Sequence, residues 1–335
     1  MKLFKNIKIV EVSDRHLLGV KGYTFYKYSF EKKKWKFYAK VDDRIIPFLS
    51  KVSYLRRFFR AEITYFYTLS DGTQLCIGKK AIFRKRKKDL TFTSCFKVMR
   101  GSRPLNICID ENEHLYFGEY FQNPDREDVF IYYSTDRGRS WNVKYTFKAG
   151  DIRHIHAVQH DPFTNNIWVL TGDDDGECMI GCTEDKFNSF NIVFRGGQEY
   201  RACKLYFYKD FIVYATDSPL IENELRIFKR DSFETKLIEK LQGSVIKGGQ
   251  VGELSFFSTT VERSKVNTCK ESHLWVSQNG LEWKDIYSDQ KDALPYVFQF
   301  GSIEFPGYQT KATNKIYFSG RALKETGGHS ACIDL

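Results

Sequence analysis

The chain has 335 residues and a formal net charge of +10. Length alone would predict about two domains of ~150 residues each, but all-β repeat folds grow by adding repeats and are the known exception. The composition favours that exception, because Phe (29) and Tyr (20) are abundant while Pro (7) is scarce, and aromatic residues suit a pleated, half-buried surface. No stretch reaches ~18 consecutive apolar residues, so we expect no membrane-spanning helix.

The N-terminus lacks the continuous apolar segment and the small-residue cleavage site of a signal peptide. We therefore expect a cytoplasmic protein, with export by a leader outside this sequence left open. The eight cysteines have no paired short spacings, so buried free thiols are expected rather than a disulfide framework or a zinc site. The basic residues form no recognised nucleic-acid motif, and we expect no nucleic-acid partner. The sequence leaves the oligomeric state open.

A unit of about 50 residues recurs along the chain, and each unit contains four predicted strands separated by turns. The third strands are the clearest, at 24–30, 81–85, 129–134, 178–182, 224–228, 272–277 and 330–335. Second strands precede most of them, at 74–78, 114–119, 166–171, 211–216, 254–259 and 315–320.

These units predict one all-β domain over residues 1–335, a β-propeller of four-stranded antiparallel blades. Seven blades are favoured, and six also fit. The strand predicted at 7–12 would complete the blade begun by the C-terminal strands, because closure by both termini removes open sheet edges.

One motif, Ser134-Thr-Asp136-Arg-Gly138-Arg-Ser-Trp141, lies in the predicted turn between a third and a fourth strand. An Asp can accept hydrogen bonds from backbone N–H groups of a turn, and Gly adopts backbone conformations that other residues resist. Trp can pack beneath the hairpin. Weaker copies lie at the same place in other units, at 183–190 with Asp185, at 277–283 with Asn279, Gly280 and Trp283, and at 29–35.

This motif resembles the Asp-box, or bacterial neuraminidase repeat, of sialidase-like and glycosyl hydrolase-like β-propellers. The resemblance implies a structural role for the box at outer turns, with the ligand site on the opposite face. Asp-boxes are found in hydrolases, polysaccharide lyases and non-enzymatic lectins, so the fold does not fix the function. Arg44-Ile-Ile-Pro47 is similar to the Arg-Ile-Pro element of sialidases, with one extra residue.

Segments that enter the innermost strands of four successive units carry basic, His, Tyr or Gln side chains. They are expected over the central channel, and they contain Arg100, Arg103, Arg153, His154, His156, Tyr200, Arg201, Lys247 and Gln250. Alternation along a strand places His154 and His156 on one side and Arg153 on the other. Loops between second and third strands are expected on the same face and contribute Glu119, Asp173, Asp175, Glu177, Asp217 and Arg321.

This combination favours a site for an acidic oligo- or polysaccharide, because Arg binds carboxylates bidentately and His or Tyr transfers protons near neutral pH. We therefore expect a glycoside hydrolase or polysaccharide lyase. The alternative is a non-catalytic glycan-binding or polysaccharide-assembly propeller. The expected catalytic residues are His154, His156, Tyr200 and Arg201. The expected substrate-binding residues are Arg100, Arg103, Arg153, Glu119, Asp217, Lys247, Gln250 and Arg321.

No cofactor is required by this scheme, but the carboxylates of Asp173, Asp175 and Glu177 suit calcium, which prefers oxygen ligands. Each group also has a purely structural interpretation. The histidines could be hydrogen-bonded channel residues, the acidic loop could be solvated, and Tyr200 with Arg201 could be a packing pair.

Overall fold

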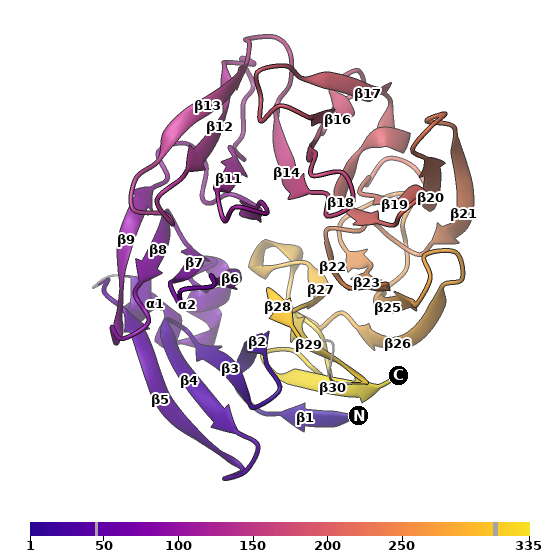
Figure 1. Ribbon diagram of the computed structural model, residues 1–335. Coiled ribbons are helices and arrows are strands. Elements are labelled where there is room, and N and C mark those ends of the chain that lie inside the picture. The colour runs from indigo at the N-terminus through magenta and orange to yellow at the C-terminus, as the bar shows by residue number, and fades with distance from the viewer. Residues whose placement is uncertain (44–45, 311–313) are drawn as a thin grey trace.

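The computed structural model describes residues 1–43, 46–310 and 314–335. Within these residues nearly all regular structure is β, and the sheets stand around a central axis with their first strands innermost and their last strands at the rim (Figure 1). The expected all-β propeller architecture is confirmed.

Four of the sheets are regular, four-stranded and antiparallel, and follow one another along the chain. The first two contain β10 (Cys108–Ile109), β11 (Leu115–Gly118), β12 (Val129–Ser134) and β13 (Asn142–Phe147), then β14 (His154–His160), β15 (Ile167–Gly172), β16 (Cys178–Thr183) and β17 (Asn191–Gly196). The next two contain β18 (Ala202–Phe207), β19 (Phe211–Thr216), β20 (Asn223–Lys229) and β21 (Thr235–Leu241), then β22 (Lys247–Val251), β23 (Leu254–Ser258), β25 (Glu271–Ser277) and β26 (Lys284–Gln290).

A nine-stranded sheet contains two further antiparallel runs of four strands. One run is β2 (Lys8–Val12), β3 (His16–Lys21), β4 (Thr24–Ser29) and β5 (Lys34–Val41), with β28 (Tyr308–Gln309) parallel to β2. The other is β6 (Tyr65–Thr68), β7 (Gln74–Gly78), β8 (Ala81–Lys85) and β9 (Thr91–Lys97). A short parallel pairing of β5 with β9 joins the two runs. The number of blades, six or seven, therefore depends on whether this sheet is counted as one blade or as two. The blade number stays a prediction.

The two termini meet in the remaining sheet, which has the order β1-β30-β29-β27-β24. Its strands are β1 (Lys2–Phe4), β30 (Ser330–Asp334), β29 (Lys315–Arg321), β27 (Gly301–Glu304) and β24 (Thr260–Val261). Closure by the N-terminus was expected from residues 7–12, but β1 makes the pairing and residues 8–12 form the inner strand of the first run. The three-residue β1 is too short to show the alternating pattern by which strands are recognised.

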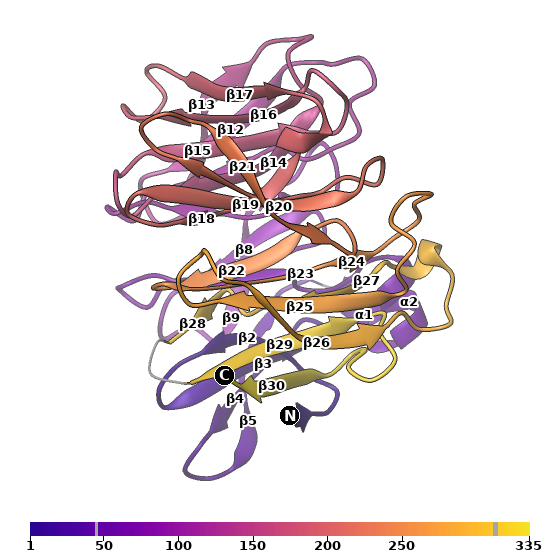
Figure 2. The same ribbon diagram turned by 90° about the vertical axis from the view of Figure 1, so that its right-hand side faces the viewer.

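Two short helices, α1 (Ile46–Lys51) and α2 (Ser53–Phe58), lie in the connection from β5 to β6 and were not expected. They lie on one face of the disc, close to the loop that follows β26 (Figure 2), where Arg57 pairs with Asp292 at 2.6 Å. Two 3-10 turns, Gln198–Tyr200 and Tyr296–Phe298, complete the regular structure, and the Phe58 ring packs 5.8 Å from that of Phe298. No helix in the described ranges is long and apolar enough to cross a membrane.

The apolar core lies between neighbouring sheets rather than at the axis. Val129 and Ile131 of β12, for example, pack in one cluster with Val158 of β14 and Val169 of β15. Each sheet thus buries both faces against its neighbours. The apolar side chains pack between the sheets, and the polar ends of the inner strands face the axis.

The Ser134–Trp141 turn has the contacts expected from its sequence. The Asp136 carboxylate accepts hydrogen bonds from the Ser134 hydroxyl (2.8 Å) and from the backbone N–H groups of Arg139 (2.9 Å) and Ser140 (3.0 Å). Gly138 has φ of +78°, a left-handed conformation that favours glycine. The Trp141 ring packs 5.0 Å from that of Phe117 in β11.

Two of the weaker copies repeat this pattern with other residues. Asp185 accepts bonds from the Thr183 hydroxyl (2.9 Å) and the Ser189 backbone (2.8 Å). Asn279 accepts bonds from the backbones of Leu281 and Glu282, both at 2.9 Å. Gly280 has φ of +76° and accepts a bond from the Trp283 indole (2.9 Å). In the fourth copy, at 29–35, the Lys32 backbone donates to the Ser29 hydroxyl (3.2 Å), and the Trp35 ring packs 5.2 Å from that of Tyr28.

Candidate functional site

His154 and His156 lie on the inner strand β14, buried in the channel wall. The Nδ1 atom of His154 is 2.9 Å from the Phe121 carbonyl oxygen, and that of His156 is 3.1 Å from the Ala202 carbonyl oxygen. The two Nε2 atoms lie 3.1 Å apart. Both imidazoles lie on one side of β14, as the sequence predicts, although the register with β15 shifts at His156. Burial lowers the pKa of His156.

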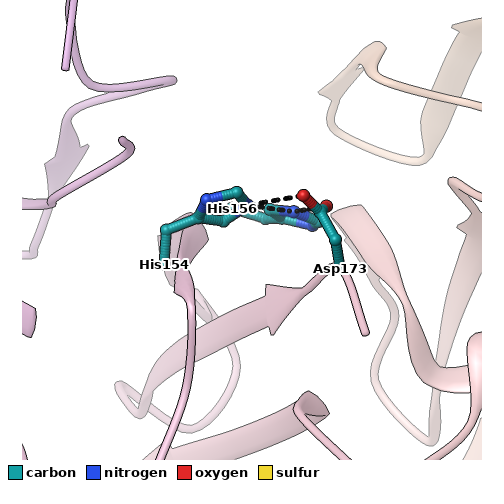
Figure 3. A group of neighbouring side chains, drawn as sticks. All are labelled: His154, His156 and Asp173. Carbon is teal, nitrogen blue, oxygen red and sulfur yellow. Dashed lines mark hydrogen bonds and ion pairs between the residues drawn. The ribbon is translucent and has the colours of Figure 1, made fainter. Parts of the chain in front are cut away.

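Asp173, directly after β15, places its carboxylate against both rings (Figure 3). Its Oδ1 is 3.2 Å from His156 Nε2, and its Oδ2 is 3.4 Å from His154 Nε2. The Arg201 guanidinium is 2.8 Å from Oδ1 and also donates to the Asp173 carbonyl (3.2 Å). Burial by itself would raise the pKa of Asp173, but its contacts with the two histidines hold it well below its usual range.

A second polar group lies beside His156 on the next sheet. The Cys203 thiol donates to Asp217 Oδ2 (3.2 Å), and a ring nitrogen of His156, the sulfur of Cys203 and a carboxylate oxygen of Asp217 all lie within 4.8 Å of one another. Burial raises the pKa of Asp217 to about 7, although Arg201, 4.0 Å away, opposes the shift. Burial also raises the pKa of Glu262, which accepts a hydrogen bond from the Ser244 hydroxyl.

Two adjoining cavities occupy the channel. A cavity of about 170 Å³ is lined by Tyr120, Asp217, Arg103 and Arg321 among others, and one of about 640 Å³ extends beside it. Tyr65, His156, Cys203 and Lys247 line both cavities.

The cations in these walls differ in how they are partnered. Arg321 lies within 2.9 Å of Glu62 and 2.6 Å of Glu304. Among the described residues, neither Arg103 nor Lys247 has a carboxylate within 4.0 Å. Arg103 donates to the backbone carbonyls of Arg60 (3.3 Å) and Glu62 (3.4 Å), and Lys247 donates to the Tyr65 hydroxyl (2.6 Å). Burial lowers the pKa of Lys247 to about 8.

Several residues expected in the site lie elsewhere. The Tyr200 ring stacks on Phe194 of β17, with centroids 5.1 Å apart and planes inclined by 7°. Tyr200 therefore packs toward the rim of its sheet and does not join His154 and His156. Tyr200 ends the 3-10 turn Gln198–Tyr200 and so lies outside the inner strand β18, which begins at Ala202.

Other expected ligand-binding residues are engaged by protein partners. Arg100 forms an ion pair with Glu119 and lies 4.4 Å from the Phe121 ring centroid. Arg153 pairs with Asp174 at 3.4 Å. Gln250 bonds both the N–H (2.9 Å) and the carbonyl (2.8 Å) of Phe207, which ties two sheets together.

The three carboxylates expected for calcium face three different partners. Asp173 contacts the histidines, Asp175 accepts from Gln198 (2.9 Å), and Glu177 pairs with Arg126 (2.6 Å). Calcium at this loop stays a prediction. Arg44 and Ile45, of the sialidase-like element, lie outside the described residues.

Sequence reasoning missed two residues of the site. The Tyr120 ring centroid lies 4.3 Å from that of His154, and Cys203 contacts Asp217. Cys203 lies two positions after Arg201, so alternation could have placed it in the channel. Tyr120 follows Glu119 in a loop that was expected on this face. The sequence there has no periodic pattern that indicates which of the two side chains enters the channel.

Comparisons with known proteins show the fold. No family model matches the chain, and no curated protein matches its sequence. Among solved structures, YCF48 bound to a D1 peptide is similar with a TM-score of 0.57 and 11% identity, over 100% of this chain and 96% of that one. The Niastella koreensis GH74 enzyme is similar with a TM-score of 0.53 and 12% identity, over 98% of this chain and 43% of that one.

Nidogen, in its complex with laminin, gives a TM-score of 0.52 and 12% identity, over 86% of this chain and 96% of that one. At such identities the likeness is one of architecture alone. The chain is therefore a β-propeller, and what it does has to be argued from the residues of its channel.

Proposed function

We propose that this protein is a carbohydrate-active propeller of the Asp-box type that binds an acidic saccharide in its central channel. The observation that carries the proposal is a pair of cations, Arg103 and Lys247. Both line the smaller channel cavity, and neither has a carboxylate partner in the described structure. A saccharide carboxylate would supply the missing counter-charge, and a charge-assisted hydrogen bond in a partly desolvated site is a strong contact. Tyr65 and Tyr120, in the same walls, offer aromatic faces and hydroxyl groups of the kind that line ligand pockets.

The choice of a saccharide over another carboxylic acid rests on the outer turns. The turns at Ser134, Thr183 and Ser277 share one hydrogen-bond pattern and carry the residues that resemble the Asp-box. The larger cavity, about 640 Å³, falls in the range of small-molecule sites and suits a short saccharide rather than a long stretch of polymer.

Hydrolysis or elimination at the same site is the second candidate function. It is favoured by the convergence of Arg201, His154 and His156 on the Asp173 carboxylate beside Tyr120. Release of reducing ends, or of an unsaturated product that absorbs in the near ultraviolet, from an acidic oligosaccharide would distinguish catalysis from binding.

Titration calorimetry of the full chain with galacturonate, glucuronate and N-acetylneuraminate tests the binding proposal, with galactose and glucose as neutral controls. We expect an acidic sugar to bind and its neutral counterpart to bind far more weakly. Lys247→Met should weaken binding by about 10- to 100-fold, which corresponds to the loss of one hydrogen bond to a charged group. Lys240→Met is the matched control, because Lys240 is exposed at the rim and pairs with Glu222 (2.6 Å). Failure of every acidic sugar to bind, or equal binding by the Lys247 variant, would contradict the proposal.

A further inference from the structure

The hydrogen bonds of His154 and His156 determine where their ring protons lie. A backbone carbonyl only accepts hydrogen bonds, so the contacts with Phe121 and Ala202 place a proton on each Nδ1. In a neutral imidazole the other nitrogen, Nε2, then carries a lone pair. The two Nε2 atoms face each other at 3.1 Å. Two lone pairs at this distance repel unless a cation or an added proton lies between them.

The third group at this point is a carboxylate. The three donor groups are separated by 3.1 Å (Nε2 to Nε2), 3.2 Å (His156 Nε2 to Asp173 Oδ1) and 3.4 Å (His154 Nε2 to Asp173 Oδ2). Two ligand atoms at about 2.0–2.1 Å from a tetrahedral zinc ion are about 3.3 Å apart. The spacing of the three side chains is therefore that of ligands around a common ion, and Figure 3 shows them pointing toward one another.

We propose that His154, His156 and Asp173 form a binding site for one divalent first-row transition ion such as Zn²⁺. Two imidazole nitrogens and one carboxylate suit Zn²⁺, Co²⁺ or Fe²⁺, whereas Ca²⁺ and Mg²⁺ prefer a shell of oxygen atoms. The inference does not depend on saccharide binding by Arg103 and Lys247, since it rests on different side chains.

The groups around the three ligands support this assignment. Metal-ligating histidines commonly donate their second N–H to a carbonyl or carboxylate, which fixes the ring orientation. Both rings here make that contact. The Asp173 carboxylate is held from its outer side by Arg201 (2.8 Å), as ligating carboxylates commonly are.

An ion could reach this site and keep an open coordination position. His156 lines both channel cavities, and the Asp173 side chain is 21% exposed, while those of the histidines are 1% exposed. Three protein ligands with an open fourth position are typical of catalytic rather than structural zinc sites. Cys203 and Asp217, which share His156 with the first group, provide further donors close to that position.

Metal titration of the full-length protein, freed of any affinity tag and stripped with a chelator, tests the site. We expect one Zn²⁺ per chain by calorimetry, competition by Co²⁺, and no binding of Ca²⁺ that competes with either. Bound Co²⁺ should show the intense visible absorption of a low-coordinate site. Zn²⁺ should also raise the melting temperature, because an ion that binds only the folded state stabilises it.

Two ligand variants and one control locate the ion. His154→Gln and Asp173→Asn should each weaken Zn²⁺ binding by more than the about 10- to 100-fold that is typical for loss of a group outside the ligand shell. Asp173→Asn keeps the size of the side chain, so it remains informative if His154→Gln does not fold. His273→Gln is the control, since His273 also lies beside a carboxylate (Asp285, 2.7 Å) and a thiol (Cys269, 3.5 Å).

The proposal is overturned if the wild-type chain binds no Zn²⁺, which would indicate that an added proton separates the two rings. It is also overturned if binding survives in a folded ligand variant, or if only His273→Gln abolishes it. A cobalt spectrum that is unchanged by Asp173→Asn would likewise exclude that carboxylate as a ligand.

Discussion

Gly172 lies so close to His156 that no side chain fits between them. A Cβ at position 172 would be 2.6 Å from Cε1 of His156 and 3.2 Å from Cγ of Arg201. We predict that Gly172→Ala displaces the His156 ring and lowers the free energy of unfolding by about 1–3 kcal/mol, the usual effect of overpacking a well-packed interior. Urea unfolding followed by circular dichroism measures this change.

Gly197→Ala, directly after β17 of the same sheet, is the matched control. Its Cβ would first meet Glu199 Oε2 (2.7 Å), the end of a side chain that can move away. The backbone at position 197, with φ of −84°, suits alanine. We expect a change within about 0.5 kcal/mol, as for ordinary surface substitutions. Equal losses in the two variants would show that contact with His156 is not the cause.

Asp136 is the acceptor on which the Ser134–Trp141 turn depends. Asp136→Ala removes the partner of two backbone N–H groups and two hydroxyls, and we expect it to cost about 1–2 kcal/mol, because water can replace part of this hydrogen bonding at an exposed turn. Asp136→Asn should cost clearly less, since Asn279 fills the same role in another turn. The midpoints of urea unfolding compare the two variants. If Asp136→Asn were as unstable as Asp136→Ala, a hydrogen-bond acceptor at position 136 would not be what stabilises the turn.

The same carboxylate predicts a dependence of stability on pH. Burial alone would raise the pKa of Asp136, but hydrogen bonds from Ser140 and Ser134 bring it to about 2 in the folded state, below the value of about 3.9 expected for an unfolded chain. The folded state therefore binds the proton less tightly, so the stabilisation is complete above about pH 4 and is lost as the pH falls toward 2. The stability difference between wild type and Asp136→Asn should shrink over that interval.

Strand positions were predictable because their signals are local. The strands predicted at 129–134 and 178–182 match β12 and β16 to within a residue, since alternation and turn residues are both encoded nearby in the sequence. The turn at Ser134 was predictable for the same reason. His154 and His156 were placed together correctly because two residues separated by one position on a strand share a side.

The rest of the site depends on contacts between distant segments. Asp173 was expected among loop carboxylates, but the path of the chain after β15 turns it toward β14. Tyr200 was expected in the channel, but a single 3-10 turn directs it onto Phe194. Neither outcome follows from residue type or spacing, because each depends on a few backbone angles in a short connection.

Closure of the ring by β1 predicts different roles for two neighbouring residues. Phe4 is buried (7% exposed) and contacts the rings of Tyr28 and Tyr317, whereas Leu3 is 37% exposed. We expect Phe4→Ala to lower the free energy of unfolding by about 3 kcal/mol, the low end for loss of a buried aromatic side chain. Leu3→Ala should cost less than about 1 kcal/mol. Similar losses, measured by urea unfolding, would mean that β1 is not anchored through Phe4.

Lys247 predicts how saccharide binding should depend on pH. Burial in the channel lowers its pKa to about 8, with Glu304 and Cys203 opposing the shift and Arg321 and Arg103 adding to it. Below about pH 8 the ammonium is charged and can pair with a saccharide carboxylate, which stays ionised throughout. Above that pH the charge is lost, so affinity should fall by about 10-fold or more between about pH 7 and about pH 9.5. Calorimetry across this range should show a steeper decline in wild type than in Lys247→Met, in which the ionisation of Asp217, with a pKa of about 7, leaves only a smaller dependence on pH. A decline of equal size in both proteins would assign the pH dependence to another residue of the channel.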